Sequence, residues 1–145
     1  MKPQNLHASC IAIGQHACLI RGPSGSGKSD LVLRLLDEQH GAKLVADDQV
    51  LISERAGALY AAAPEILAGK LEIRGQGIVA RPYLAEVKIS HIIDLVQPQD
   101  ITRMPDAAEI CVTLMGIAFP RLKLDPFQVS ATARLRAFLC GKFFS

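Results

Sequence analysis

The chain has 145 residues, of which 50% are hydrophobic, and its formal net charge is +2 at pH 7. This length and hydrophobicity suit one compact domain, and the small charge argues against a nucleic-acid-binding protein. No apolar run reaches the roughly 18 residues of a membrane-spanning helix, and the N-terminus lacks the apolar segment of a secretory signal. The sequence therefore predicts a domain with no nucleic-acid or membrane partner.

The chain contains no tryptophan and few aromatic residues, so we expect a core built from Leu, Ile, Val and Ala. Its four cysteines are Cys10, Cys18, Cys111 and Cys140, and no two of them have the C-x-x-C spacing of zinc or dithiol sites. They are predicted to be reduced, buried packing residues, which is typical of a cytoplasmic protein.

The first third of the chain carries both strand and helix signals. Residues 6–14 and 16–22 are apolar segments separated by a turn, and they predict two strands. Residues 29–39 place apolar side chains at i, i+4 spacing and predict an amphipathic helix, which the glycine at position 41 is expected to end. Residues 43–48 predict a short buried strand.

The rest of the chain is richer in strand signals. Residues 49–53 and 58–62 predict a hairpin, and residues 86–96 have a β-rich composition. Residues 108–114 suit a strand or a helix. Residues 130–140 predict a closing helix with its first residue, a serine, as N-cap. Together these elements predict an α/β fold with a mixed sheet flanked by helices.

Residues 20–30, IRGPSGSGKSD, contain the motif G-x-x-x-x-G-K-[ST] between an apolar strand and a helix. In this P-loop motif, glycines let successive backbone N–H groups converge on phosphate oxygens, and the helix adds its positive N-terminal end. Lys28 is expected to reach the β- and γ-phosphates of ATP, and the Ser29 hydroxyl to bind Mg²⁺. The residues predicted to bind the nucleotide are Gly22, Pro23, Ser24, Gly25, Ser26, Gly27, Lys28 and Ser29.

Two consecutive aspartates, Asp47 and Asp48, end the apolar segment LVADDQV. Neighbouring strand residues point to opposite faces, so one carboxylate can serve Mg²⁺ while the other accepts a proton from an attacking hydroxyl. The alternative is that an aspartate here only caps a turn. The pair lies 18 and 19 residues after Ser29, which leaves no room for the machinery of an energy-transducing ATPase and favours a phosphotransferase.

The segment LEIRGQGI, residues 71–78, places Glu72 and Arg74 two positions apart, so they share a face if the segment is extended. A carboxylate there can join the Mg²⁺ shell, and a guanidinium can neutralise transferring phosphate oxygens. Gly75 and Gly77 permit a tight or mobile loop over the phosphate. The alternative is an exposed Glu–Arg pair of little energetic value.

The three segments GPSGSGKSD, LVADDQV and PEILAGKLEIRGQGI, in this order, resemble the bacterial HPr kinase/phosphorylase family. That family phosphorylates a serine of HPr, the phosphocarrier protein of the phosphotransferase system. The similarity spans roughly residues 6 to 125 and corresponds to the family's C-terminal catalytic domain. It implies one P-loop kinase domain over residues 1–145, of the phosphoenolpyruvate carboxykinase-like type, with the N-terminal regulatory domain absent. It also implies ATP and Mg²⁺ as cofactors, HPr as partner, and a homo-hexamer.

The resemblance also implies roles for individual residues. Asp48 resembles the family's proton acceptor in the kinase reaction and proton donor in the reverse direction, and Glu72 resembles a Mg²⁺ ligand. His7 and Arg103 resemble catalytic positions; a histidine beside a strand and an arginine in a solvated loop are their structural alternatives. The family's RPGRN-type segment, tied to phosphorylase action, is not recognisable here, so reverse phosphorolysis is left open.

Two other functions compete with this interpretation. A small-metabolite kinase of the shikimate or gluconate type also has a P-loop and an early acidic strand end, and Arg134 and Arg136 would then serve as lid residues. That scheme gives the segment LEIRGQGI no role. The third possibility is a nucleotide-sensing protein that binds ATP without transferring its phosphoryl group.

Overall fold

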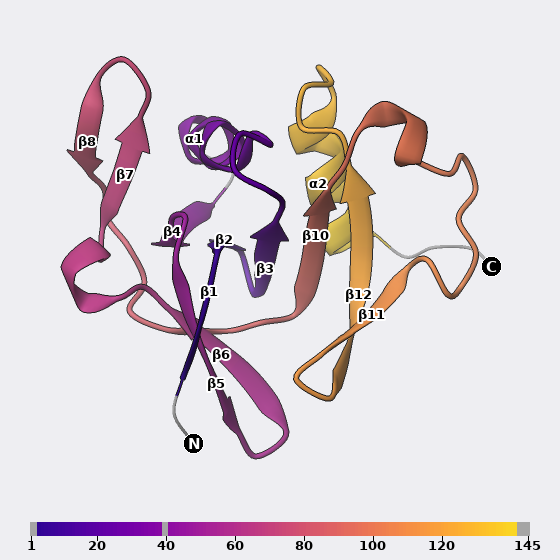
Figure 1. The fold of residues 1–145 in the computed structure, drawn as a ribbon, viewed down its shortest axis with the longest axis horizontal. Coiled ribbons are helices and arrows are strands. Elements are labelled where there is room, and N and C mark those ends of the chain that lie inside the picture. Colours follow the sequence, from indigo (N-terminus) through magenta and orange to yellow (C-terminus); the bar gives the residue numbers. More distant parts are fainter. Residues whose placement is uncertain (1–2, 39–40, 142–145) are drawn as a thin grey trace.

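The computed structural model of the chain describes residues 3–38 and 41–141, and its centre is a six-stranded mixed sheet with the order β11-β12-β10-β3-β2-β4 (Figure 1). Strands β3, β10 and β12 are parallel to one another, whereas β2 and β11 run antiparallel to their neighbours. The strands of this sheet are β2 (Ala8–Ile13), β3 (His16–Arg21), β4 (Ala42–Ala46), β10 (His91–Leu95), β11 (Cys111–Leu114) and β12 (Ile117–Leu124).

Two smaller sheets and two α-helices complete the described part of the chain. The first small sheet, β1-β5-β6-β9, is antiparallel throughout, and the second is the hairpin β7-β8. The remaining elements are β1 (Gln4–Leu6), α1 (Lys28–Asp37), β5 (Val50–Arg55), β6 (Ala58–Ala62), the 3-10 turn η1 (Glu65–Leu67), β7 (Lys70–Ile73), β8 (Gly77–Ala80), β9 (Val87–Lys88), the 3-10 turn η2 (Pro98–Asp100) and α2 (Ala131–Cys140).

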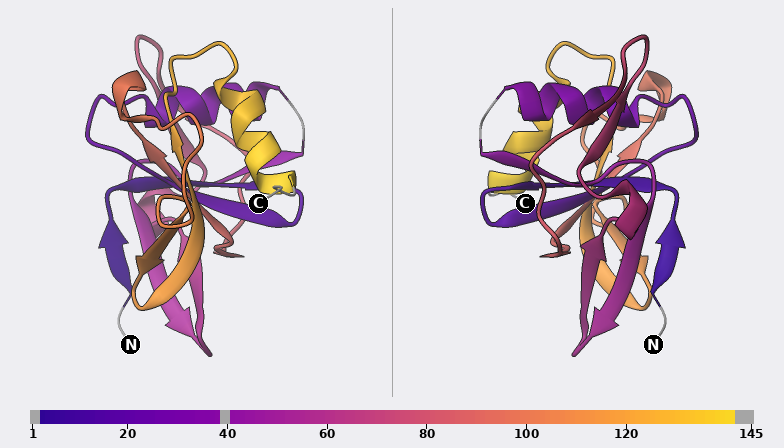
Figure 2. Two further views of the ribbon diagram at one scale, coloured as in Figure 1. Left: turned by 90° about the vertical axis from the view of Figure 1, so that its right-hand side faces the viewer. Right: turned by 90° about the vertical axis from the view of Figure 1, so that its left-hand side faces the viewer.

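The two faces of the six-stranded sheet each pack against a separate apolar core. On one face, side chains of α1 and α2 pack against β2, β3 and β10, and both helices lie on that side of the sheet (Figure 2). On the other face, β5 and β6 cover residues such as Cys10, Leu19 and Ile92. Both cores are mainly aliphatic, as predicted; Phe119 and Phe138 are their buried phenylalanines. The predicted α/β fold with a mixed sheet is therefore confirmed.

Several predicted elements differ in detail from the observed ones. The strand predicted over 6–14 is interrupted at His7, and the one predicted over 43–48 ends at Ala46. The ambiguous segment 108–114 is a turn followed by β11. Ser130 occupies the N-cap position of α2, but its hydroxyl accepts a hydrogen bond from the Arg134 side chain and caps no backbone N–H. The predicted end of the first helix at 39 falls outside the described residues.

The cysteines are only partly as expected. Within the described residues all four thiols are free; Cys10 and Cys18 are buried, and burial raises the pKa of Cys18 to about 12. Cys111 and Cys140 are exposed, so the prediction that all four are buried is wrong. Cys111 is the first residue of β11 and Cys140 is the last residue of α2.

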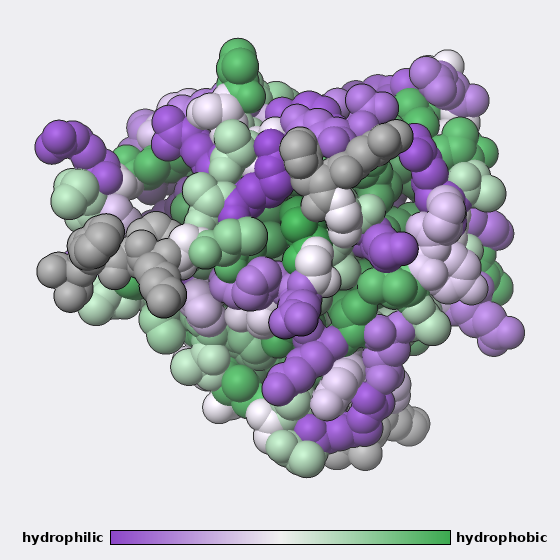
Figure 3. All heavy atoms as spheres, turned by 180° about the vertical axis from the view of Figure 1, so that it is seen from behind, coloured by the Kyte–Doolittle hydropathy of each residue, from purple (hydrophilic) through white to green (hydrophobic). Residues whose placement is uncertain are grey.

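Neither α-helix of the described residues is long and apolar enough to cross a membrane. On the face opposite to that of Figure 1, hydrophilic and hydrophobic groups are interleaved over the described surface (Figure 3).

One edge of the six-stranded sheet gathers the segments that carry the predicted site. β3 ends there and continues into the phosphate loop, and β10 and β12 end at the same edge because they run parallel to β3. The first residue of β2, Ala8, lies opposite the last residue of β3, Arg21. β4 runs antiparallel to β2 and so also ends at this edge. Ligands of open α/β sheets bind outside the carboxyl ends of parallel strands.

Below this edge, Asp94 joins three strands of the sheet. Its carboxylate accepts hydrogen bonds from Arg21 Nε (2.7 Å) and from Arg121 Nη1 (2.9 Å). Burial alone would raise the pKa of Asp94, but the hydrogen bonds and charges of the two arginines outweigh it and lower the pKa below its usual value. The folded protein therefore stabilises the ionised form of Asp94 more than the unfolded chain does.

We expect Asp94→Asn to lower the free energy of unfolding by about 1–3 kcal/mol at pH 7. The substitution removes hydrogen bonds between charged groups and leaves Arg21 and Arg121 without the negative charge between them. Since the folded-state pKa lies below the unfolded value of about 3.9, the contribution of the carboxylate is complete above that pH and is lost as the pH falls through the folded pKa. Urea unfolding measures the free energy of unfolding of both proteins, and the difference between them should therefore become smaller below pH 4. If this difference stays constant with pH, or equals the difference caused by the exposed control Asp100→Asn, the ionised Asp94 carboxylate does not stabilise the fold.

Candidate functional site

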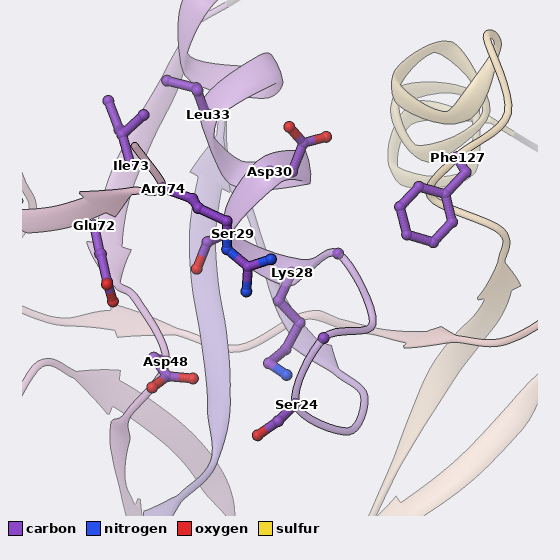
Figure 4. Close-up of a pocket in the computed structure, with 12 residues that line it drawn as sticks. Ser24, Lys28, Ser29, Asp30, Leu33, Asp48, Glu72, Ile73, Arg74 and Phe127 are labelled. Carbon is purple, nitrogen blue, oxygen red and sulfur yellow. The ribbon is translucent and has the colours of Figure 1, made fainter. Parts of the chain in front are cut away.

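A pocket of about 620 Å³ lies at the edge of the sheet where these segments meet (Figure 4). The phosphate loop and the start of α1 form its floor, the segment after β4 and the β7-β8 hairpin form one side, and Phe127 lies on the other. The structure thus brings together residues that the sequence places far apart. The predicted site residues that line the pocket are Ser24, Gly25, Gly27, Lys28, Ser29, Asp48, Glu72 and Arg74.

The phosphate loop has the backbone that its glycines were expected to allow. Gly25 and Gly27 have φ angles of 81° and 100°, in the left-handed region where glycine carries no steric cost. α1 begins at Lys28 without a side-chain cap, so its first backbone N–H groups remain available to an anion. The Ser26 hydroxyl is buried and has no hydrogen-bond partner among the described residues. Such an orphaned donor inside a phosphate loop is what a phosphate oxygen would satisfy.

Lys28 is almost fully buried and bonds to its own loop. Its Nζ donates to the carbonyl oxygens of Gly22 (2.6 Å) and Pro23 (3.1 Å). Burial lowers the pKa of Lys28, while the negative charges of Asp48 and Asp47 oppose that shift. The ammonium group is therefore held at the loop by two carbonyl oxygens, and phosphate oxygens are stronger acceptors for it.

Asp47 turns inward from the end of β4. Its Oδ1 accepts hydrogen bonds from the hydroxyls of Ser29 (2.9 Å) and Ser9 (3.1 Å), and the backbone N–H of Glu72 also donates to it. Burial raises the pKa of Asp47, and these hydrogen bonds only partly offset the shift. Asp47 does not itself line the pocket, but Ser29, which donates to it, does. Within residues 3–38 and 41–141, no lysine or arginine forms an ion pair with this carboxylate, so a buried acid that a cation would stabilise lies next to Ser29.

Asp48 lies on the pocket wall with its side chain 59% exposed. The side chains of Asp47 and Asp48 point in different directions, as expected. Strand alternation is not the cause, because β4 ends at Ala46, before both residues. Asp48 adopts a left-handed backbone, φ 69°, which turns the two carboxylates apart. His7 Nδ1 lies 3.4 Å from Asp48 Oδ1, and His7 Nε2 lies 3.3 Å from Ser24 Oγ. His7 thus connects Asp48 to the phosphate loop.

The β7-β8 hairpin carries Glu72 and Arg74 into the pocket. Glu72 lies in β7 and points to the side of Asp48, while Arg74 lies in the turn and its guanidinium reaches over the pocket (Figure 4). The turn is closed by a hydrogen bond from the backbone N–H of Gln76 to the carbonyl of Ile73 (2.9 Å). Glu72 and Arg74 are both exposed, and no ion pair joins them in the described part of the chain, so their catalytic and metal-binding roles stay predictions.

Three arginines considered from the sequence lie outside the pocket. Arg103 is exposed on the connection between η2 and β11, so its catalytic role stays a prediction. Arg134 donates to Ser130 within α2, and Arg136 donates to Glu38 at the end of α1 (2.5 Å). These contacts tie α2 to its surroundings and leave neither arginine among the residues that line the pocket.

Ser9 is a site residue that the sequence analysis missed. Its hydroxyl is fully buried, donates to Asp47 Oδ1 and accepts the backbone N–H of Asp48 (3.1 Å). A single side chain on β2 therefore orients both aspartates. A polar residue within the apolar segment LHASCIAIG was the signal that could have found it.

We expect Ser9→Ala to lower the free energy of unfolding by about 1–3 kcal/mol, because the N–H of Asp48 loses its acceptor and Asp47 loses a donor in a buried site. Chemical denaturation measures this loss. Ser53→Ala, at a partly exposed serine on β5, is the matched control and should stay within about 0.5 kcal/mol of the unaltered chain. Equal effects of the two substitutions would mean that Ser9 does not support the aspartates.

Comparisons with known proteins identify relatives of this chain. The family model described as the HPr Serine kinase C-terminal domain matches residues 1–123. The HPr kinase/phosphorylase of Clostridium tetani (strain Massachusetts / E88) is 39% identical over 90 residues, and that of Clostridium novyi (strain NT) is 42% identical over 79 residues. These matches span 62% and 54% of this chain but 28% and 25% of those proteins.

A solved structure also resembles the chain. The structure titled as the Hpr(Ser) kinase/phosphatase from Coxiella burnetii has a TM-score of 0.74 and 25% sequence identity. The likeness covers 92% of this chain and 95% of that one. The arrangement of the sheet and helices is therefore shared over nearly the whole length of both.

Proposed function

The chain belongs to the HPr serine kinase C-terminal domain family, and we propose that it transfers the γ-phosphoryl group of ATP to a serine of HPr, the phosphocarrier protein of the phosphotransferase system. The relatives named HPr kinase/phosphorylase and the similar solved structure support this substrate. The observation that carries the proposal is the position of Asp48, an exposed carboxylate on the wall of the pocket above the phosphate loop.

The phosphates of ATP bind along the loop from Gly22 to Ser29. Backbone N–H groups of the loop and of the α1 N-terminus bond the phosphate oxygens, and Lys28 leaves its two carbonyl partners to hold the β- and γ-phosphates. Arg74 reaches over the pocket and neutralises charge on the transferring group. The first role of these residues is to hold the γ-phosphorus facing the open side of the pocket.

The serine of HPr enters beside Asp48. Its oxygen forms a bond to the γ-phosphorus, its proton passes to the Asp48 carboxylate, and the bond from phosphorus to the bridging oxygen of ADP breaks. His7 keeps the Asp48 carboxylate directed at this point through its contact with Oδ1, and Ser24 fixes the other side of the imidazole. In phosphorolysis, an oxygen of inorganic phosphate would bond to the phosphoserine phosphorus, the bond from phosphorus to the serine oxygen would break, and Asp48 would return the proton to that oxygen, leaving pyrophosphate and serine.

The floor of the pocket suits Mg²⁺, which binds proteins through one or two carboxylates together with substrate phosphates and waters. Ser29 and Asp47 would hold the ion, and Glu72 supplies a second carboxylate nearby. The buried Asp47, which forms no ion pair with a lysine or arginine of the described residues, supports this assignment. In the described part of the chain, no group of three or more acidic, histidine or cysteine side chains is arranged to hold a metal ion, so much of the coordination falls to ATP and water. When bound, the ion neutralises charge on the phosphate oxygens.

Membership of the family also suggests an oligomeric state and a cellular compartment for this protein. We propose a homo-hexamer of catalytic domains acting in the cytoplasm, where HPr and ATP meet. Ile66 of η1 and Ile78 of β8 are exposed apolar side chains, which is consistent with contact to another protein or another copy of the chain.

The test is phosphorylation of purified HPr. The protein is incubated with radiolabelled ATP, Mg²⁺ and HPr, and acid-stable phosphoserine on HPr is the expected product. Labelling of shikimate or gluconate in place of HPr would support the small-metabolite kinase, which no contact of Arg134 or Arg136 favours. Binding of ATP without any labelled product would support a nucleotide-sensing protein.

A further inference from the structure

A second pocket adjoins the first at the carboxyl ends of the parallel strands. It has a volume of about 430 Å³ and shares Ser24, Gly25 and Phe127 with the larger pocket. Its walls come from the loops that follow β3, β10 and β12, which end side by side in the sheet. The phosphate loop therefore separates two connected spaces, of which the proposed chemistry uses only the first.

Phe127 lies between the two pockets on a turn that holds it in an exposed position. Phe127 is 71% exposed, although hydrogen bonds hold the backbone of its turn in place. The backbone N–H of Phe127 donates to the buried Asp125 (3.0 Å), the carbonyl of Pro126 accepts from the Arg34 guanidinium, and Arg34 also bonds to Asp30 of α1. A Cβ placed on Gly27 would lie 3.3 Å from Phe127 Cζ, so the ring lies against the phosphate loop.

The side of the pocket on which Phe127 lies indicates its ligand. Asp48 and Glu72 lie on one side of Lys28, and Phe127 lies on the other (Figure 4). A nucleotide whose terminal phosphate faces Asp48 must extend its nucleoside in the opposite direction, past the phosphate loop. Its base then reaches the place where the anchored turn presents an exposed aromatic ring.

We propose that Phe127 is a stacking platform for the base of the bound nucleotide and that the second pocket receives the nucleoside. Apolar side chains of Leu95, Val96 and Pro98 complete that pocket, which suits the flat, weakly polar face of a base. The family model ends at residue 123, so its match does not include this segment. The inference rests on the proposed function only in requiring that a nucleotide binds; it does not depend on HPr.

The test compares ADP with inorganic tripolyphosphate, which has phosphates but no base. We expect Phe127→Ala to weaken ADP binding about 5- to 150-fold, the equivalent of about 1–3 kcal/mol for stacking on one aromatic ring, and to leave tripolyphosphate binding unchanged. Isothermal titration calorimetry measures both. The matched control is Val129→Ala, at a fully exposed apolar residue two positions further on that lines neither pocket, and it should change neither affinity.

A second variant reports on the same contact without removing the ring. The chain has no tryptophan, so Phe127→Trp creates a single indole whose fluorescence should be quenched by ADP and not by tripolyphosphate. Circular dichroism verifies that each variant is folded. Equal loss of ADP and tripolyphosphate affinity in Phe127→Ala, or no loss of either, overturns the proposal. A change in sedimentation with unchanged ADP binding also overturns it and assigns the ring to a contact between copies of the chain.

The outcomes separate this inference from the proposed function. Loss of ADP affinity confined to the Phe127 variants supports base stacking even if HPr is never labelled. Phosphorylation of HPr at an unchanged ADP affinity in Phe127→Ala contradicts the stacking role and leaves the kinase proposal standing. Failure of the unaltered chain to bind either ligand contradicts both.

Discussion

Asp48→Asn is expected to lower the rate of phosphoryl transfer to HPr by about 10²–10⁴-fold while leaving ATP binding nearly unchanged. Asparagine keeps the size of the side chain but cannot accept a proton from the serine hydroxyl. The left-handed backbone at this position, φ 69°, is also one that asparagine tolerates, so the local fold should persist. The expected loss is therefore one of chemistry and not of structure.

Single-turnover phosphorylation of HPr measures the rate, and calorimetry with ADP measures the binding. Asp100→Asn, the same substitution at an exposed residue of η2, is the control and should transfer phosphate at the normal rate. A normal rate for Asp48→Asn would show that another group accepts the proton. A parallel loss of rate and of ADP affinity would instead assign Asp48 to the binding of the nucleotide.

Lys28→Met is expected to reduce transfer at least about 100-fold, the loss typical of removing one preorganised donor to developing charge. Methionine retains the unbranched chain that packs in this buried position, but it donates to neither the phosphates nor the loop. The hydrogen bonds of Lys28 Nζ to Gly22 and Pro23 also disappear, so the empty phosphate loop should become more mobile. ATP affinity is expected to fall together with the rate.

The same assays test this variant, and hydrogen exchange of the phosphate-loop amides reports on the loop. Lys43→Met, on the exposed side of β4, removes an equal charge and is the matched control. If Lys28→Met transferred phosphate at the rate of Lys43→Met, the phosphate loop would not be the site of phosphoryl transfer. Faster amide exchange without loss of transfer would limit Lys28 to a structural role.

Much of the fold and part of the site could be predicted from the sequence, because their determinants are local. The glycines, Lys28 and Ser29 of the phosphate loop act within a few residues of one another, and the loop needs only a strand before it and a helix after it. The i, i+4 spacing that predicted α1 and the turn between β5 and β6 are equally local signals. The aliphatic composition likewise fixed the character of both cores.

The tertiary structure decided what depends on distant segments of the chain. Ser9 meets Asp47 and Asp48 only because β2 pairs with both β3 and β4. Phe127 reaches the phosphate loop because β12 runs parallel to β10 and β10 to β3, so that the loops after them end at one edge. Spacing along the chain carries little information about such contacts, because strand order and direction are set by the packing of the whole sheet.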